Sequence, residues 1–422
     1  MKPHSIARPL PPGFVALLIL LALGIGVGQF IPEAAAVEIG PESDFCAAAN
    51  ALGPGEELVM QPGDYHGPCT ILRGGRPGAP LVIRAADPNH RPRIVYTGRD
   101  ADVIAVKADH VTIRGLALGP TSRDADGIRV FARANVVIED CEFNGVGGIA
   151  VAATHRSITG LVVRRNVLLD SGSTGMYFGC HEGLDCVVSG LLVERNFIRT
   201  VRAVAPEIGY GLQVKLNSMG VIRDNVIVDT KGPGIMVYGS RDLLSGTLVE
   251  RNFVMGSLTS SGIVVGGGPA VVRNNVSVMN REAGIGLEDY AGRGLLRAIV
   301  LANNTLYRNA GGGVAVPSEN RLRAVTIVNN AASAWQGAPA FPRERTDVDM
   351  AGNVDCTWAL CFANPEGMDF SPVAGSLLRA PGAIRAIDGM PADDYFGIRR
   401  PVLPSAGAIE KGHGAIVIGP KP

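Results

Sequence analysis

The residues of this sequence that could do chemistry are concentrated between positions 177 and 242. Lysine is scarce in the central chain, where Lys107, Lys215 and Lys231 stand among many arginines. Around Lys215 the sequence gathers side chains that can transfer a proton, hold a carboxylate or stack on a ring: Tyr177, His181, Glu182, Tyr238, Arg241 and Asp242. Aromatic faces with scattered hydrogen-bonding groups suit sugar rings, because a sugar is apolar on its faces and polar at its edges. This segment therefore favours a carbohydrate ligand.

A repeat runs through the chain and would position these residues. A motif of β-branched residues ending in Asn recurs at Asn166, Asn196, Asn225, Asn252, Asn275, Asn304 and Asn330. The spacings between these Asn residues are 30, 29, 27, 23, 29 and 26. Each period holds two or three short strands of alternating apolar residues, which cannot bury their apolar face alone but can do so when coils stack. The sequence predicts an all-β parallel β-helix of about ten coils, with an N-terminal cap and an irregular C-terminal cap.

The recurrent Asn is expected to be structural. It follows each strand where the chain turns, and Asn tolerates left-handed backbone angles there. Stacked Asn side chains can also bond to one another along the solenoid axis. Cys141 ends the matching motif that begins at Val136, so we expect a buried ladder position and not a reactive thiol.

A second motif, a Gly followed by alternating apolar residues, predicts the direction of the side chains. In the stretch 211–216 the alternation sends Leu212, Val214 and Leu216 inward and sends Gln213 and Lys215 outward. Stacking equivalent strands predicts two outward columns, Tyr177–Gln213–Met236 and Gly179–Lys215–Tyr238. Arg129 is expected on the same face in an earlier coil, and Asn217 and Arg241 in loops just past the strands.

The chain resembles the pectin-lyase-like superfamily of right-handed β-helices over residues 58–330. The segments 58–65 and 78–85 are similar to the first coils of the alginate and chondroitin lyases of polysaccharide lyase family 6. Segments 393–399 and 407–410 are similar to the end of many secreted bacterial β-helix proteins. The resemblance implies a right-handed parallel β-helix that acts on a uronate-containing glycan by β-elimination, or by C5-epimerisation, since both remove the C5 proton.

A uronate lyase must neutralise the carboxylate, remove the C5 proton and assist the O4 leaving group. The family resemblance implies a Lys base on one coil and an Arg on the next, and Lys215 and Arg241, 26 residues apart, match these places. His181 or Tyr238 would assist the leaving group. The residues expected to bind substrate are Tyr177, Gln213, Arg129, Met236 and Asn217.

The same family has a carboxylate-rich calcium cluster beside its Lys, and this sequence departs from that pattern. Gln213 stands where a carboxylate is expected, and only Glu182, Asp185 and Glu207 could substitute. Ca²⁺ is therefore a candidate cofactor and not a required one.

Each candidate also has an ordinary structural interpretation. Lys215 could be a solvated lysine, Arg241 could pair with Asp242, and His181 could simply be exposed between two cysteines. The alternative function is then a non-catalytic β-helix that binds glycan or serves as an envelope scaffold. A hydrolase would need two facing carboxylates, and no convincing pair stands out.

The seven cysteines suit an oxidising compartment. Their spacing makes three local disulfides plausible, Cys46–Cys69, Cys180–Cys186 and Cys356–Cys361, with Cys141 left over. The pairing is open at this point, because spacing alone does not fix connectivity.

The N-terminal segment 1–36 reads as a signal peptide, with a basic start, an apolar run and a small-residue cleavage site, although an uncleaved anchor helix is the alternative. The β-helix domain with its cap is expected at 37–334 and a Pro/Gly-rich cap and tail at 335–422. The net charge of zero gives no electrostatic case for nucleic acid. We expect a secreted or periplasmic monomer that binds an acidic polysaccharide and has no membrane span after cleavage.

Overall fold

The computed structural model describes residues 35–180, 186–203, 208–241, 246–288, 295–317, 322–343, 345–379, 390–412 and 414–421. The predicted signal segment lies almost wholly outside these residues, as do four candidate site residues: His181, Glu182, Asp185 and Glu207. Residues 35–422 form one compact unit. Within the described residues no helix combines the length and the apolarity that crossing a bilayer requires.

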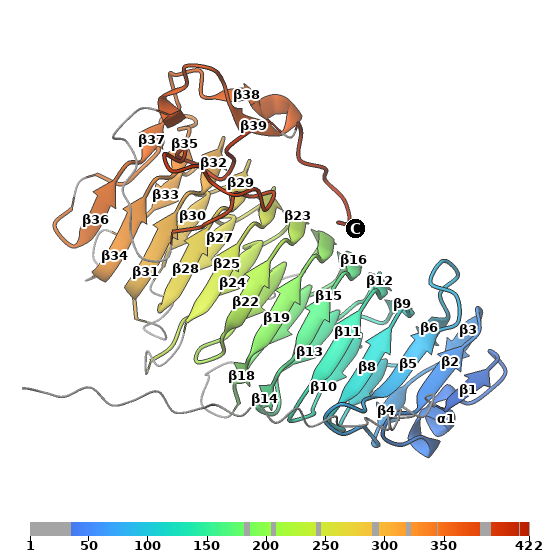
Figure 1. Cartoon of the computed structure of the whole chain (residues 1–422). Coiled ribbons are helices and arrows are strands. Elements are labelled where there is room, and N and C mark those ends of the chain that lie inside the picture. The colour runs from blue at the N-terminus through green and yellow to red at the C-terminus, as the bar shows by residue number, and fades with distance from the viewer. Residues whose placement is uncertain are drawn as a thin grey trace, which may run out of the picture. The chain divides into compact units, whose positions relative to one another are not determined.

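Three parallel sheets run the length of this unit, and successive strands visit them in turn (Figure 1). Sheet 1 consists of β1 (Ala36–Ile39), β2 (Glu57–Met60), β5 (Leu81–Ala85), β8 (Val111–Arg114), β11 (Val136–Glu139), β15 (Val162–Arg164), β19 (Leu191–Glu194), β22 (Gly220–Arg223), β25 (Thr247–Glu250), β28 (Ala270–Arg273), β31 (Arg297–Ala302), β34 (Arg323–Val328) and β36 (Val348–Ala351). The predicted all-β, right-handed parallel β-helix is confirmed.

Sheets 2 and 3 complete each coil. Sheet 2 consists of β3 (Asp64–His66), β6 (Arg93–Tyr96), β9 (Ala117–Thr121), β12 (Glu142–Asn144), β16 (Val167–Ser171), β20 (Phe197–Val201), β23 (Val226–Thr230), β26 (Phe253–Met255), β29 (Val276–Val278), β32 (Thr305–Tyr307), β35 (Ala331–Ala332) and β37 (Val354–Asp355). Sheet 3 consists of β4 (Cys69–Ile71), β7 (Ile104–Val106), β10 (Ile128–Val130), β13 (Val151–Ala153), β17 (Met176–Phe178), β21 (Leu212–Val214), β24 (Ile235–Val237), β27 (Ile263–Val265), β30 (Ile285–Leu287) and β33 (Val314–Ala315). A short extra pair, β14 (Ile158–Thr159) and β18 (Val188–Ser189), lies beside two of the coils.

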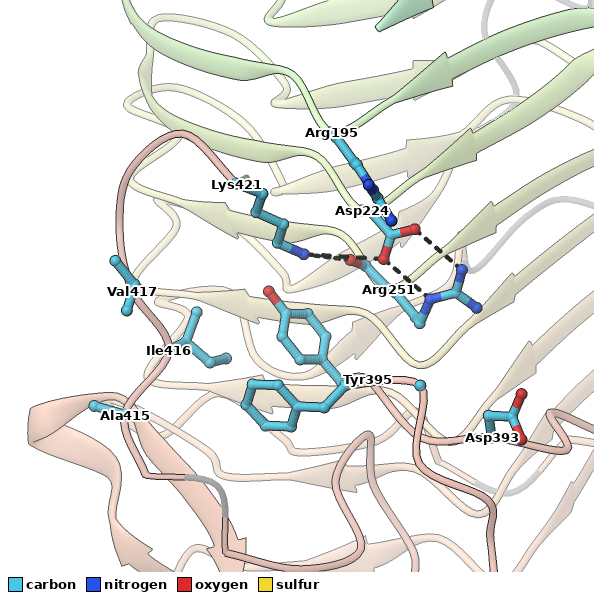
Figure 2. Close-up of a pocket in the computed structure, with 11 residues that line it drawn as sticks. Arg195, Asp224, Arg251, Asp393, Tyr395, Ala415, Ile416, Val417 and Lys421 are labelled. Carbon is cyan, nitrogen blue, oxygen red and sulfur yellow. Dashed lines mark hydrogen bonds and ion pairs between the residues drawn. The ribbon is translucent and has the colours of Figure 1, made fainter. Parts of the chain in front are cut away.

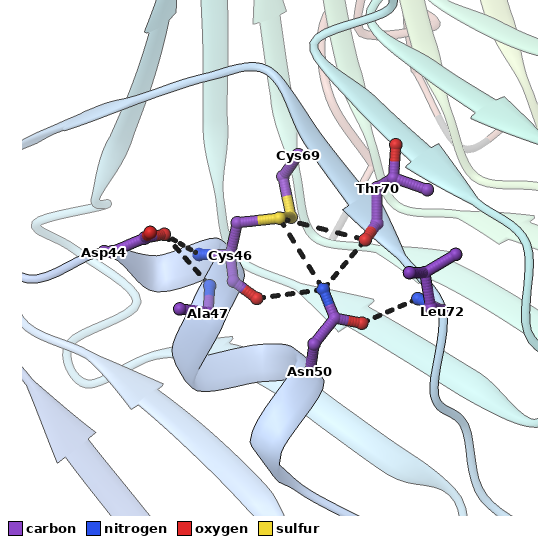
Figure 3. The surroundings of a disulfide bond; sticks show 7 residues. All are labelled: Asp44, Cys46, Ala47, Asn50, Cys69, Thr70 and Leu72. Carbon is purple, nitrogen blue, oxygen red and sulfur yellow. Dashed lines mark hydrogen bonds between the residues drawn. A yellow bond between two sulfur atoms is a disulfide. The ribbon is translucent and has the colours of Figure 1, made fainter.

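The inward residues of all three sheets form one continuous apolar core, because alternate residues of every strand point into the solenoid. Helix α1 (Phe45–Ala51) covers the N-terminal end of this core, and Phe45 is fully buried there. The Cys46–Cys69 disulfide links the helix to β4 (Figure 3). Beside it the Asn50 side-chain amide donates to the carbonyl of Thr70 at 2.8 Å. The helix and the disulfide thus cover the end of the core beside β4.

A ladder of asparagine side chains runs through the interior, as the repeat predicted. Each amide nitrogen donates to the amide oxygen of the next at 2.9–3.0 Å, through Asn166, Asn196, Asn225, Asn252, Asn275, Asn304, Asn330 and Asn353. Asn353 is a rung that the sequence repeat did not identify. The backbone N–H of Cys141 donates to Asn166 at 3.0 Å, so Cys141 heads the ladder. Burial raises the pKa of its thiol to about 12, which fits the predicted structural role.

The left-handed residues of the turns are not the ladder residues, and this part of the prediction is wrong. Positive φ angles of 53–64° occur instead at the residue just before each rung, for example Arg165, Arg195, Asp224 and Arg251. The ladder Asn is inward and buried, because its side chain must reach both neighbouring coils. The residue before it makes the turn and faces outward.

The C-terminal segment closes the solenoid and then folds back over sheet 2. An antiparallel pair, β38 (Phe362–Asn364) and β39 (Asp369–Pro372), follows the last coil, with short 3₁₀ turns at Pro365–Gly367 (η1) and Leu377–Arg379 (η2). A second apolar cluster joins the outer face of sheet 2, through Phe253 and Val276, to Tyr395 and Ile409 of the tail. The tail is therefore held by apolar packing against the outside of the coils.

Candidate functional site

The candidate site lies on the outer side of sheet 3, where β17, β21 and β24 lie side by side. The strand register pairs Tyr177 with Gln213 and Gln213 with Met236, so the first predicted column is confirmed. The same register places Arg129 two strands before Tyr177 and Val264 one strand after Met236. Side chains from coils distant in sequence are thus brought to one face.

Lys215 directly follows β21 and belongs to the second predicted column. Its backbone N–H donates to the carbonyl of Phe178 at 2.8 Å, and the N–H of Tyr238 donates to the carbonyl of Val214 at 3.0 Å. Gly179 precedes Lys215 in this column with a φ of +95°, and a Cβ atom there would lie 3.1 Å from the Cβ of Lys215. A glycine at this position therefore leaves room for the lysine stem.

The Lys215 ammonium group lies between two tyrosine rings from the neighbouring coils. Its Nζ is 5.2 Å from the ring centroid of Tyr177 and 4.1 Å from that of Tyr238. Lys215 is only 2% exposed and Tyr238 only 1%. A desolvated cation over an aromatic face gains on the order of 2 kcal/mol, so the rings fix the position of the charge.

Met236 and Tyr238 of the two outward columns are covered, which the sequence did not predict. Met236, Tyr238 and Val264 form a small buried cluster with Tyr210 and Leu216, separate from the main core. The predicted inward direction of Leu216 is wrong, because β21 ends at Val214 and the strand alternation no longer applies two residues later. The residues on either side of β21 pack over the sheet face and bury it.

Tyr210 is a site residue that the sequence motifs did not identify. Its hydroxyl lies 3.3 Å from that of Tyr238, and both rings are buried. The signal that could have identified it is its position just before Gly211, at the start of the coil that carries Lys215.

Gln213 is the buried polar group of the site. It is 3% exposed, and its Oε1 atom has no hydrogen-bond partner among the described residues. Leaving a buried acceptor unpaired costs about 1–3 kcal/mol. An unpaired acceptor between an aromatic ring and a methionine is therefore suited to a ligand hydroxyl group.

Arg129 belongs to a separate cluster of charged residues in an earlier coil. It forms ion pairs with Asp126 and, at 3.0 Å, with Asp102, and it lies near Thr154 and His155. Burial raises the pKa of Asp126, and burial together with the Arg129 charge lowers the pKa of His155. The structure thus supports a structural role for Arg129 in an earlier coil, and its predicted substrate contact stays a prediction.

Asn217 and Arg241 are brought together in the turns that follow β21 and β24. The Arg241 backbone N–H donates to the Asn217 side chain at 2.9 Å, and the Asn217 N–H donates to the carbonyl of Gly239 at 2.8 Å. Asn217 has a φ of +64°, so it makes the turn as well as the contact. Arg241 is exposed and lies one coil from Lys215, as predicted.

No group of three or more His, Cys, Asp or Glu side chains that could hold a metal ion occurs among the described residues. The three acidic candidates, Glu182, Asp185 and Glu207, lie outside them. Gln213 supplies a single neutral oxygen, whereas a Ca²⁺ site needs about six to eight oxygen ligands. Gln213 alone therefore does not form such a site.

The three disulfides agree with the suggested local pairing. Cys46–Cys69, Cys180–Cys186 and Cys356–Cys361 are bonded, and Cys141 is free and buried. The Cys180–Cys186 bond joins the second residue after β17 to the second residue before β18.

A second concave region lies under the C-terminal tail, away from these residues (Figure 2). It encloses about 710 Å³ and is lined by Asp224, Arg251, Tyr395 and Lys421. Asp224 accepts two hydrogen bonds of 3.0 Å from Arg251 and lies 4.0 Å from the Lys421 ammonium group. The charges of this pocket are largely satisfied within the chain, so we attribute it to docking of the tail.

Comparisons with known proteins support the fold. Residues 188–338 match the family model described as a right-handed β-helix region. Among curated proteins, none matches the sequence. The crystal structure of an alginate lyase from Paenibacillus sp. str. FPU-7 superposes with a TM-score of 0.51 at 16% identity, over 73% of this chain and 99% of that one.

Two further solved structures have the same architecture. The polysaccharide lyase family 6 enzyme Pedsa3628 from Pseudopedobacter saltans has a TM-score of 0.52 at 14% identity, over 76% of this chain and 92% of that one. The complex of XylC with xylose has a TM-score of 0.61 at 11% identity, over 89% and 99% of the two chains. The chain therefore has the right-handed parallel β-helix fold of these proteins.

Proposed function

We propose that this protein is an exported polysaccharide-active enzyme, a β-eliminating lyase or C5-epimerase on a uronate-containing glycan. The observation that carries the proposal is the buried Lys215 held between Tyr177 and Tyr238, beside the unpartnered amide oxygen of Gln213. As the neutral amine, Lys215 would accept the C5 proton while the C4–O4 bond breaks, and Arg241, one coil on, would neutralise the carboxylate. Tyr238 or His181 would assist the leaving group.

The solved proteins with the same fold support the substrate class, since two of them are named polysaccharide lyases. Three disulfides support an oxidising compartment and hence a secreted or periplasmic location. The partner would be an acidic polysaccharide bound by a monomer.

The test is an assay for the unsaturated uronate that elimination creates, which absorbs at roughly 235 nm. The purified chain is incubated with alginate, pectate, chondroitin and heparin, with and without Ca²⁺. We expect absorbance to rise on one polymer and Lys215→Ala to lower the rate by about 10²–10⁴-fold, the usual contribution of a general base.

Lys107→Ala is the matched control. Lys107 occupies the equivalent position after β7 and its Nζ lies 5.7 Å from the Phe131 ring, yet Lys107 is exposed. Its loss should leave the rate unchanged. Equal rates for Lys215→Ala and wild type would remove Lys215 from the mechanism. A flat trace on every polymer calls for an NMR assay of C5 inversion, which separates an epimerase from a protein without turnover.

A second candidate function is non-catalytic glycan binding. It is favoured by the 2% exposure of Lys215, because a base must contact the proton that it removes. Retention of a polymer on an affinity column, together with neither elimination nor C5 inversion, would support this alternative.

A further inference from the structure

The two tryptophans of the chain lie together, outside the site described above. Trp335 follows β35 and Trp358 follows β37, and the register that pairs Ala332 with Asp355 places the two tryptophans at equivalent positions of successive coils. Both line a cavity of about 700 Å³ at the turn between sheet 2 and sheet 3, near the end of the solenoid where β35 and β37 lie in Figure 1. We call this surface the tryptophan platform.

The platform is open to solvent, unlike the buried ring of Tyr238 beside Lys215. Trp335 is 38% exposed and Trp358 is 97% exposed. A side chain this exposed gains little of the roughly 1.5–3 kcal/mol that burying a large apolar side chain provides. Exposed apolar surface rimmed by polar groups marks an interaction site.

The platform is also held rigid. The Cys356–Cys361 disulfide closes the short loop that carries Trp358. The Ala334 N–H donates to the Thr357 hydroxyl at 2.7 Å, which ties this loop to the residue before Trp335. A preformed binding surface loses little entropy when a ligand binds.

Arg308 supports Trp335 from the preceding coil. Its guanidinium carbon lies 4.6 Å from the Trp335 ring centroid, and an ion pair of 2.6 Å to Glu366 fixes its orientation. Arg308 and Trp335 also line an adjoining cavity of about 400 Å³, together with Leu258, Met279 and Arg281 of earlier coils. The hollow therefore continues along the turns of successive coils.

The shape and the chemistry of this groove favour a polysaccharide. Four coil steps, from the coil of Leu258 to that of Trp358, span about 19 Å at about 4.8 Å per strand spacing. Aromatic faces stack on sugar rings. Asp355, Thr357 and Gln336 around the tryptophans can bond to hydroxyl groups, and Arg281 supplies a cation for a carboxylate.

We propose that the tryptophan platform is a second glycan-binding site, which holds a distant part of the polymer that reaches Lys215. This proposal rests on the proposed function for its choice of polymer. Sheet 3 links the two sites. The segment that follows Trp335 bonds to β33 through Ala340, which accepts from the Val314 N–H. This segment lies five strand spacings beyond β21, or about 24 Å along the solenoid. One extended chain could therefore contact both sites.

Intrinsic tryptophan fluorescence tests the proposal directly, since both tryptophans are in the platform and neither is near Lys215. Lys215→Ala protein, in which a polymer would not be consumed, is titrated with alginate, pectate, chondroitin and xylan. We expect a saturable change in fluorescence with one polymer and the same affinity in wild type. Trp358→Ala should weaken binding about tenfold, the upper range for an aromatic contact.

Leu403→Ala is the control, because Leu403 is 79% exposed but lies in the tail and not in the platform. It should leave the dissociation constant unchanged. An unchanged constant in Trp358→Ala, or a polymer that is cleaved without any fluorescence change, would overturn the platform. Fluorescence changes with lipid vesicles or peptides but with no glycan would also overturn it.

The outcomes separate the two proposals. Saturable fluorescence without turnover by wild type supports the platform and rejects the enzyme. Turnover that depends on Lys215 without a fluorescence response supports the enzyme and rejects the platform.

Discussion

Two pairs of aromatic residues on the same solenoid differ in their exposure to solvent. Tyr177 and Tyr238 come from coils on either side of Lys215. Tyr177 is half-buried, and the turns beside β21 pack over Tyr238. Trp335 and Trp358 also come from adjacent coils, but nothing among the described residues packs over Trp358, which is 97% exposed. Stacking of the coils explains why the members of each pair lie near one another. The pairs differ in exposure because turn residues pack over the face of sheet 3 and not over Trp358.

The contrast shows which aromatic residues serve folding and which are free for another use. A covered ring stabilises the protein and orients a charge. Trp358, which is uncovered on a loop closed by a disulfide, does neither, so its ring is accessible to a ligand. The predictions below test this division, from the largest expected effect to the smallest.

Tyr238→Ala should cost the most. Removing a ring that is 1% exposed deletes its burial and leaves a cavity, which costs about 3–5 kcal/mol for an aromatic side chain. Tyr238→Phe should cost about 1 kcal/mol, because it removes the hydroxyl that lies 3.3 Å from that of Tyr210. Urea unfolding followed by circular dichroism measures both. A cost below about 1 kcal/mol for the alanine variant would mean that the ring is not covered.

Breaking the platform disulfide should have the next largest effect. The double variant Cys356→Ser with Cys361→Ser should lose about 2 kcal/mol for a loop this short, and the fluorescence anisotropy of Trp358 should fall as the loop loosens. The corresponding double variant at Cys180 and Cys186, on the Lys215 side, should leave the anisotropy unchanged. Equal anisotropy in both double variants would refute a rigid platform.

Gln213→Leu should separate stability from activity. The substitution removes a buried oxygen that has no described partner, so the protein should gain about 1 kcal/mol of stability. Turnover should fall, because the acceptor for the substrate hydroxyl is lost. Thermal unfolding and the elimination assay are measured on the same preparation. A destabilised variant with full activity would show that Gln213 is an ordinary structural residue.

Trp358→Ala should have the smallest effect on stability, within about 0.5 kcal/mol of wild type, as for surface substitutions generally. The same urea unfolding experiment measures it. A loss comparable to that of Tyr238→Ala would place Trp358 in a packed interface and end the contrast between the two pairs.

Much of the architecture was predictable because it is periodic. The recurring Asn motif predicted the coils and the buried ladder, including the odd position of Cys141. The Gly motif predicted both columns, because equivalent strands of successive coils pair in the same register. The local cysteine spacings suggested pairs that the structure contains.

What depended on the turns could not be predicted in this way. The burial of Met236 and Tyr238 follows from how the non-repeating residues around Tyr210 and Leu216 fold over sheet 3. The platform likewise arises where Trp335 and Trp358 fall one coil apart, although no motif of their own precedes them. The residue before each rung adopts a left-handed backbone angle because the Asn side chain that follows must point inward.

The asparagine ladder implies that rungs are gained or lost only as whole coils, while the length of each coil can vary. Each amide bonds to its equivalents in the coils above and below, and periods of 23 to 30 residues satisfy the same bond. Deleting residues 253–275 would remove one complete period and leave Asn252 facing Asn304. Insertions within a turn are tolerated for the same reason, so new loops can be grafted between fixed rungs while the interior is unchanged.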